Sequence, residues 1–151
     1  MNDKKLQVSA IKDGTVIDHI PANSLFKVIN ILNLDKVETQ MTFGSNFESE
    51  KLGLKAIIKL SDVFFEDDDI NKIALVAPEA KLNIIKDYHV VEKKVVVVPD
   101  NIKGIAKCVN PKCVTNNESI TTKFTVVSKK KVAIKCHYCE KITDSEHMEI
   151  F

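Results

Sequence analysis

Apolar and polar residues alternate over several short stretches of the first hundred positions, and this period of two predicts β-strands. The alternation is clear in residues 6–12 and 15–19, and Asp13-Gly14 between them is typical of a tight hairpin turn. Further strands are expected at residues 39–47, 54–60, 81–89 and 90–98.

Two other stretches have the longer period of an amphipathic helix. Leu25, Val28, Ile29 and Leu32 recur at helical spacing after Pro21, with Asn23 or Ser24 as the helix start. A second apolar stripe at 70–76 follows the acidic run 66–69, whose carboxylates favour the positive end of a helix dipole, and ends before Pro78. The order of elements predicts an α+β, ferredoxin-like fold in which two helices cover one face of an antiparallel sheet.

The pattern changes near residue 100, where helical periodicity stops and all four cysteines of the chain follow. They form two short-spaced pairs, Cys108-x4-Cys113 and Cys136-x2-Cys139, separated by 22 residues. Such pairs predict a tetrahedral Zn²⁺ site whose four thiolates leave no open position, so the metal is structural. We therefore expect a domain at 1–100 and a small all-β zinc domain at 101–151. A redox role for Cys136 and Cys139 is the alternative, but no strand–helix context supports it.

The composition of the chain narrows the range of possible functions. The chain has 44% hydrophobic and 28% charged residues and a net charge of +1, as soluble globular proteins do. It contains no arginine, which weakens proposals of nucleic-acid binding. No apolar run is long enough to cross a membrane and the first residues are polar, so we expect a cytoplasmic protein with neither membrane nor nucleic acid as a partner. We find no catalytic motif.

The segment Leu6-Gln-Val-Ser-Ala-Ile-Lys-Asp-Gly-Thr-Val-Ile-Asp-His-Ile-Pro-Ala22, followed by the cysteine pairs, resembles the regulatory chain of aspartate carbamoyltransferase. Asn110-Pro-Lys-Cys-Val-Thr-Asn116 and Cys136-His-Tyr-Cys-Glu-Lys141 match as well, and the resemblance covers essentially the whole chain. It implies a non-catalytic subunit that forms homodimers through its N-terminal domain. Three such dimers join two catalytic trimers, and CTP, UTP and ATP act as effectors of pyrimidine biosynthesis.

The resemblance also implies a nucleotide site in the first domain. Lys93, with one or both of Lys55 and Lys59, would meet the phosphates and ribose, beside Asp18 and His19. Contacts around the base would come from Val8, Ala10, Ile11, Ile85 and Tyr88, with Val16, Asn83 and Val90 as weaker candidates. Without the resemblance, a lysine pair on a strand is usually a solvated face and Tyr88 would be a core residue. Because adjacent strand residues point to opposite faces, Asp18 and His19 are not expected to form an acid–base pair.

In the zinc domain, the resemblance places Asn110, Glu140 and Lys141 against the catalytic chain. Val109 and Lys112 depart from some family members, which puts the detail of that contact in doubt. Two other functions stay open on the residues alone. One is a zinc-ribbon nucleic-acid-binding protein, and the other is a small-molecule-binding module of a different enzyme.

Overall fold

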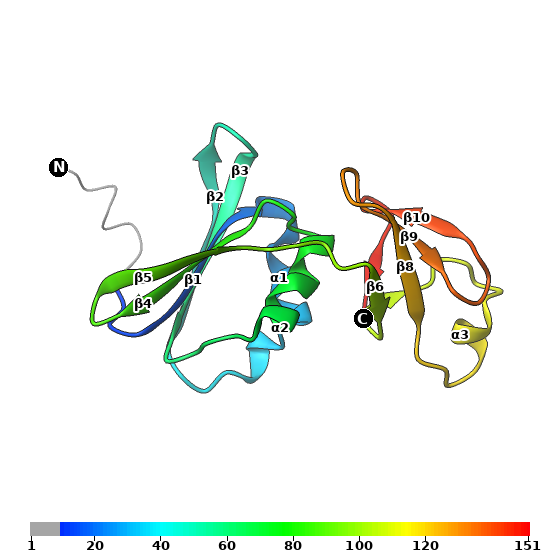
Figure 1. Ribbon diagram of the computed structural model, residues 1–151, viewed down its shortest axis with the longest axis horizontal. Coiled ribbons are helices and arrows are strands. Elements are labelled where there is room, and N and C mark those ends of the chain that lie inside the picture. The colour runs from blue at the N-terminus through cyan, green and yellow to red at the C-terminus, as the bar shows by residue number, and fades with distance from the viewer. Residues whose placement is uncertain (1–9) are drawn as a thin grey trace. The chain divides into compact units, whose positions relative to one another are not determined.

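The computed structural model describes residues 10–151, and the chain divides into two compact units (Figure 1). One unit ends at Val96 and the other runs from Val97 to Phe151. Each unit has its own sheet and its own buried apolar side chains. No helix in the described part of the chain is long and apolar enough to span a membrane.

The first unit is a five-stranded antiparallel sheet with two helical regions, one between β1 and β2 and one between β3 and β4. Its strands are β1 (Gly14–Pro21), β2 (Met41–Ser49), β3 (Gly53–Ser61), β4 (Lys81–Lys86) and β5 (His89–Val95), in the spatial order β2-β3-β1-β4-β5. The helical segments are η2 (Ala22–Ser24), α1 (Leu25–Ile31), η3 (Leu34–Lys36), α2 (Asp67–Asn71) and η4 (Lys72–Leu75). The first four strands have the ferredoxin-like order, and β5 extends it at one edge. The predicted α+β class is confirmed.

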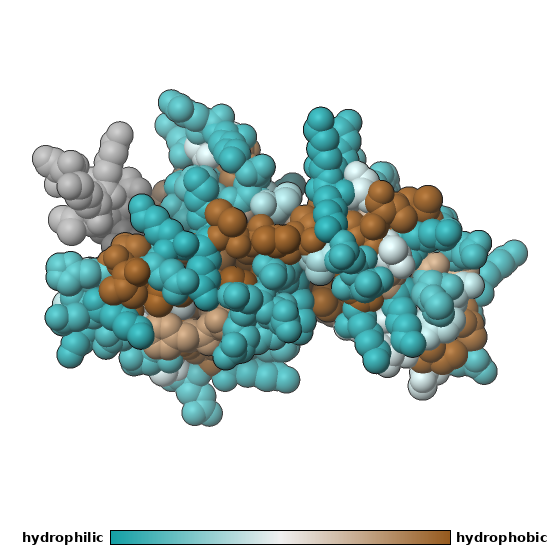
Figure 2. Space-filling model, viewed as in Figure 1, coloured by the Kyte–Doolittle hydropathy of each residue, from teal (hydrophilic) through white to brown (hydrophobic). Residues whose placement is uncertain are grey.

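The core of this unit lies between the sheet and the helices, which cover one face (Figure 1). Ile17, Ile58 and Leu82 enter it from three neighbouring strands, and Val28 and Ile73 enter it from the helical side; each is at most 1% exposed. Thr15 and Ile17 are buried on that face, so Val16 between them points to the other face. On the side of the molecule seen in Figure 2, hydrophilic residues predominate, with apolar patches among them.

The predicted hairpin at Asp13-Gly14 is wrong. Residues 10–13 form no strand, and the earlier part of the predicted strand 6–12 lies outside the described residues. Strand β1 starts at Gly14 and is paired on both sides, with β3 and with β4, so it has no free edge for a preceding strand. Asp13 instead supports neighbouring loops: its carbonyl accepts from the Asp62 N–H at 2.9 Å, and its carboxylate accepts from the Asp87 N–H at 3.1 Å.

The second unit is built from short strands around the cysteine knuckles. A four-stranded sheet has the order β10-β9-β8-β6, and a two-stranded sheet pairs β11 with β7. Their bounds are β6 Asn101–Lys103, β7 Ala106–Lys107, β8 Lys123–Ser128, β9 Ala133–Cys136, β10 Ile142–Asp144 and β11 Glu149–Ile150. One turn of helix, α3 (Val114–Asn117), interrupts the expected all-β pattern directly after Cys113.

Candidate metal centre and ligand-binding face

The four cysteines converge on one point in the second unit. Their Sγ atoms all lie within 4.8 Å of one another, with Cys108 to Cys139 at 3.6 Å and Cys113 to Cys136 at 3.7 Å. The close pairs therefore join one cysteine of each knuckle. A tetrahedral ion with Zn–S bonds of about 2.3 Å requires sulfurs about 3.8 Å apart. The four thiols fit such an ion.

Local hydrogen bonds hold each knuckle in shape. In the first, the Asn116 side-chain amide donates to the carbonyls of Cys108 and Asn110, both at 2.8 Å, and Asn117 donates to the Cys113 carbonyl at 2.9 Å. In the second, the Glu140 N–H donates to the Cys136 carbonyl at 3.0 Å, and Glu140 has a φ of 64°. Sequence reasoning gave no role to Asn116 or Asn117. Their position just after a knuckle, where asparagine commonly bonds to backbone, was the available signal.

The thiols differ in acidity because their surroundings differ. Burial raises the pKa of the Cys108 thiol to about 12 and also raises the pKa of Cys136. Burial acts in the same direction on Cys139, but hydrogen bonds involving the Lys141 backbone and the Asn110 side chain lower its pKa to about 7. Metal ions bind thiolates, so a bound cation must displace the protons held by the buried thiols.

In the first unit, four of the sequence-predicted residues lie in one row across the sheet. The register pairs Lys59 with Val16, Val16 with Asn83, and Asn83 with Lys93, on strands β3, β1, β4 and β5. Since Val16 points away from the helix-covered core, the row lies on the opposite face of the sheet. Partial burial lowers the pKa of Lys59. The structure thus places two ammonium groups and an amide on one surface.

A β-bulge brings Asp18, His19 and Lys55 together at one end of this row. The register of β1 against β3 shifts between Ile17 and Ile20, and His19 takes a left-handed φ of 60°. Asp18 accepts a hydrogen bond from the His19 N–H at 2.6 Å and forms an ion pair with Lys55 at 3.1 Å. His19 Nδ1 is buried without a hydrogen-bond partner in the described residues, 3.6 Å from the Asp18 carboxylate. No hydrogen bond joins the two side chains, as expected, but they do not point to opposite faces, because the bulge breaks the strand alternation.

The other end of β1 carries most of the remaining predicted contacts. Gly14 is paired with Ile85, Ile85 is paired with Val90, and Tyr88 lies in the turn between β4 and β5. The Tyr88 N–H donates to the Lys12 carbonyl at 2.9 Å, so the segment that contains Ala10 and Ile11 lies beside this turn. Tyr88 is 63% exposed and is not the core residue that an isolated tyrosine suggests. Val8 lies outside the described residues.

The three residues predicted to contact a partner lie at the knuckles. Asn110 accepts a hydrogen bond from the Lys112 N–H at 3.0 Å, and the Lys141 carbonyl accepts one from the Cys136 N–H at 3.0 Å. Glu140 and Lys141 are exposed and Asn110 is partly exposed. The cysteine cluster therefore fixes the backbone that presents all three.

The fold and the sites define a class: a two-unit protein in which a ferredoxin-like sheet with a polar open face accompanies a module organised around a closed four-cysteine metal centre. The family model for the aspartate carbamoyltransferase regulatory chain, allosteric domain, matches residues 6–97, and the model for its metal binding domain matches residues 100–149. The chain belongs to the family of aspartate carbamoyltransferase regulatory chains, and it is a non-catalytic subunit.

Curated relatives agree over the full length. Aspartate carbamoyltransferase regulatory chains from Bacteroides fragilis and Phocaeicola vulgatus are 55% and 53% identical over 149 residues, which cover 99% of this chain and 97% and 96% of theirs. The regulatory chain of aspartate carbamoyltransferase from Pyrococcus abyssi is 51% identical over 146 residues, with 95% of this chain and 96% of that one covered.

Proposed function

We propose that this subunit binds nucleotide effectors on the open face of its first unit and passes the signal to the catalytic chain of aspartate carbamoyltransferase. In this proposal CTP and UTP lower the activity of the assembly and ATP raises it. The observation that carries the proposal is the row Lys59–Val16–Asn83–Lys93, which continues at one end into the group Asp18, His19 and Lys55.

The chemistry of these residues suits a nucleoside triphosphate. Lys59, Lys93 and Lys55 are point charges for phosphate oxygens, and Asn83 offers both a donor and an acceptor to the ribose. The partnerless Nδ1 of His19 is a buried polar atom for which a ligand would supply the hydrogen bond. Asp18 forms an ion pair with Lys55 at 3.1 Å and so orients the lysine ammonium group at this end of the row.

The length of β1 separates the two ends of the proposed site. The four residue steps from Gly14 to Asp18 span about 13 Å at about 3.3 Å each, a length suited to an extended nucleotide. The base would lie beside Tyr88, Ile85, Val90, Ala10 and Ile11, together with Val8. The phosphates would lie at the bulge.

We propose Zn²⁺ as the ion of the cysteine cluster. The ion would supply structural cross-linking, since Cys108, Cys113, Cys136 and Cys139 fill its shell. Its role would be to hold the two knuckle loops that present Asn110, Glu140 and Lys141 to the catalytic chain. A free thiolate cluster of this kind is stable in a reducing compartment, which supports a cytoplasmic location.

The proposed assembly contains two catalytic trimers and three regulatory dimers, with the dimer formed through the nucleotide-binding domain (1–100) and the catalytic contact through the zinc domain (101–151). A nucleotide shifts this assembly only by its difference in affinity for two quaternary states. Couplings of this kind are typically about 1–3 kcal/mol.

The test is reconstitution with catalytic trimers, followed by aspartate saturation curves with and without CTP and ATP. We expect CTP and ATP to move the curve in opposite directions. Lys93→Gln should abolish the response to CTP, whereas Lys36→Gln, an exposed lysine of η3 on the helical side, should preserve it. A curve that neither nucleotide changes in the unaltered chain would contradict the proposal.

A further inference from the structure

A pocket of about 270 Å³ lies on the sheet of the second unit and reaches the second cysteine knuckle at one residue, His137. Strands β6 and β8 form it, together with His137 at the end of β9. Ile102 and Phe124 are paired across the two strands and are only 3% and 2% exposed, so their side chains point to the core and their backbone forms the base of the pocket.

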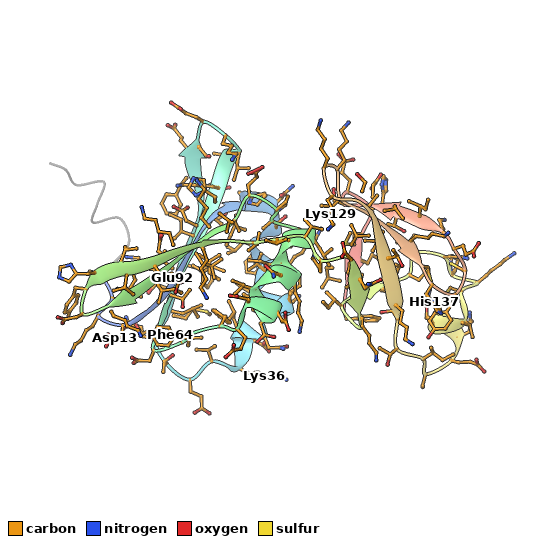
Figure 3. All side chains as sticks on the ribbon, viewed as in Figure 1. Asp13, Lys36, Phe64, Glu92, Lys129 and His137 are labelled. Atoms are coloured by element: carbon orange, nitrogen blue, oxygen red, sulfur yellow. The ribbon has the colours of Figure 1, made fainter. Side chains whose placement is uncertain are left out.

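Three nitrogen-bearing side chains line up across this pocket. Lys103 is paired directly with Lys123 in the register of β6 against β8, and the His137 N–H donates to the Lys123 carbonyl at 2.8 Å. All three residues are exposed, and His137 is labelled in Figure 3. Asn101 and Thr125, the next cross-strand pair on the same face, line the pocket beside them.

Two like charges in direct cross-strand opposition destabilise a sheet unless something neutralises them. None of the described residues that line the pocket is acidic, and neither lysine has an ion pair within the described chain. Lys129 shows how a lysine charge can be neutralised within the chain, because its ammonium group lies 2.6 Å from an Asp100 carboxylate oxygen. The charge of the Lys103–Lys123 pair is thus not neutralised by any described side chain.

We infer that this pocket is a binding site for a small multiply charged oxyanion such as a phosphate or diphosphate group. Two ammonium groups and an imidazole donor would converge on its oxygens, and Asn101 and Thr125 would bond to the remaining part of the ligand. The site lies in the second unit and is separate from the proposed nucleotide face, so it is independent of the function proposed above.

The experiment is an NMR titration of the full-length, zinc-loaded chain with pyrophosphate at constant ionic strength, following backbone amides. We expect saturable shifts at Lys103, Lys123 and His137. Lys123→Gln should weaken this binding about tenfold or more, since one charge-assisted contact is lost, and Lys123→Arg should retain most of it. Lys130→Gln, in the turn between β8 and β9, is the matched control and should leave the affinity unchanged.

The location of the shifts separates this site from the nucleotide face, where pyrophosphate could also bind. Saturable shifts confined to the first unit would overturn the inference, as would shifts at Lys123 that do not saturate. Equal affinity in Lys123→Gln and Lys130→Gln would overturn it as well. Lys103→Gln provides a second variant with the same expected loss.

Discussion

At the scale of single residues, the metal centre depends on side chains that never touch the metal. Asn116 bonds to two carbonyls of the first knuckle, including that of the ligand Cys108. Thr115 Oγ1 lies 3.2 Å from Cys113 Sγ. Residues that hydrogen-bond to metal ligands orient them, and loss of such a residue commonly lowers metal affinity about 10–100-fold.

We expect Asn116→Ala to weaken zinc binding by about tenfold or more, because two backbone carbonyls of the knuckle lose their donor. Competition with a chromogenic chelator measures this affinity directly. Asn30→Ala, on the exposed side of α1 in the other unit, serves as the matched control. Equal zinc affinity in the two variants would show that the knuckle holds its shape without the amide.

At the scale of elements, two irregular places of the sheet lie at the proposed nucleotide face, the bulge in β1 and the turn between β4 and β5. The β4–β5 turn has positive φ at both Asp87 (51°) and Tyr88 (67°), between the paired residues Lys86 and His89. These angles are those of a type I′ hairpin turn, which favours Asn-Gly or Asp-Gly. A tyrosine there costs stability, which is a reason to look for a role of its side chain in binding.

Tyr88→Gly should therefore raise the free energy of unfolding of the first unit by up to about 1 kcal/mol, because glycine adopts positive φ without steric cost. The same variant should lose affinity for CTP. Urea unfolding and calorimetric titration provide the two measurements, and Tyr88→Phe should leave stability unchanged. A less stable Tyr88→Gly variant would mean that the exposed ring contributes packing that outweighs the strain.

The same elements show how far sequence reasoning reaches. Periodicity found both helical regions and the strands β1 to β5, since burial of Val28, Ile58 or Leu82 requires a regular apolar spacing, but it did not place the short strands β6, β7, β10 and β11. It failed at Asp13-Gly14, where local turn chemistry suggested a hairpin but the two edges of β1 were already taken by β3 and β4. Strand pairing between distant segments cannot be read from local pattern.

The sites differ in how far the sequence predicts them, because one depends on residue spacing and the others depend on backbone conformation and strand register. The cysteine spacing predicted one cluster, and the four Sγ atoms do converge. The contact between Asp18 and His19 could not be predicted from alternation, because it depends on a bulge and a left-handed residue. The Lys103–Lys123 pair needed the register of β6 against β8, which the sequence does not contain.

At the scale of the whole molecule, the two units are stabilised in different ways. The first has a continuous apolar core of helices against a sheet, whereas the second has short strands of two to six residues around four thiols. A module with so little core relies on its metal for folding energy.

Removing the metal should therefore unfold residues 97–151 while the sheet of the first unit persists. Amide hydrogen exchange with and without a chelator would show loss of protection confined to the second unit. Loss of protection in both units together would contradict this separation.

Metal affinity should fall as pH falls, since the ion competes with protons for thiolates. Rebinding at pH 7 should release the proton of the Cys108 thiol, whose pKa is about 12, and proton release can be measured with a pH indicator.

The 3.6 Å and 3.7 Å approaches of the sulfurs have a practical consequence for handling the protein. Once emptied, the cluster presents two thiol pairs that each need only a small movement to form a covalent S–S bond. Oxygen in air would then oxidise the metal-free thiols to disulfides, and added zinc would no longer bind to them. Purification and storage therefore call for a reductant. A preparation that shows no response to nucleotides should be treated with reductant and zinc together before the result is ascribed to the proposed nucleotide face.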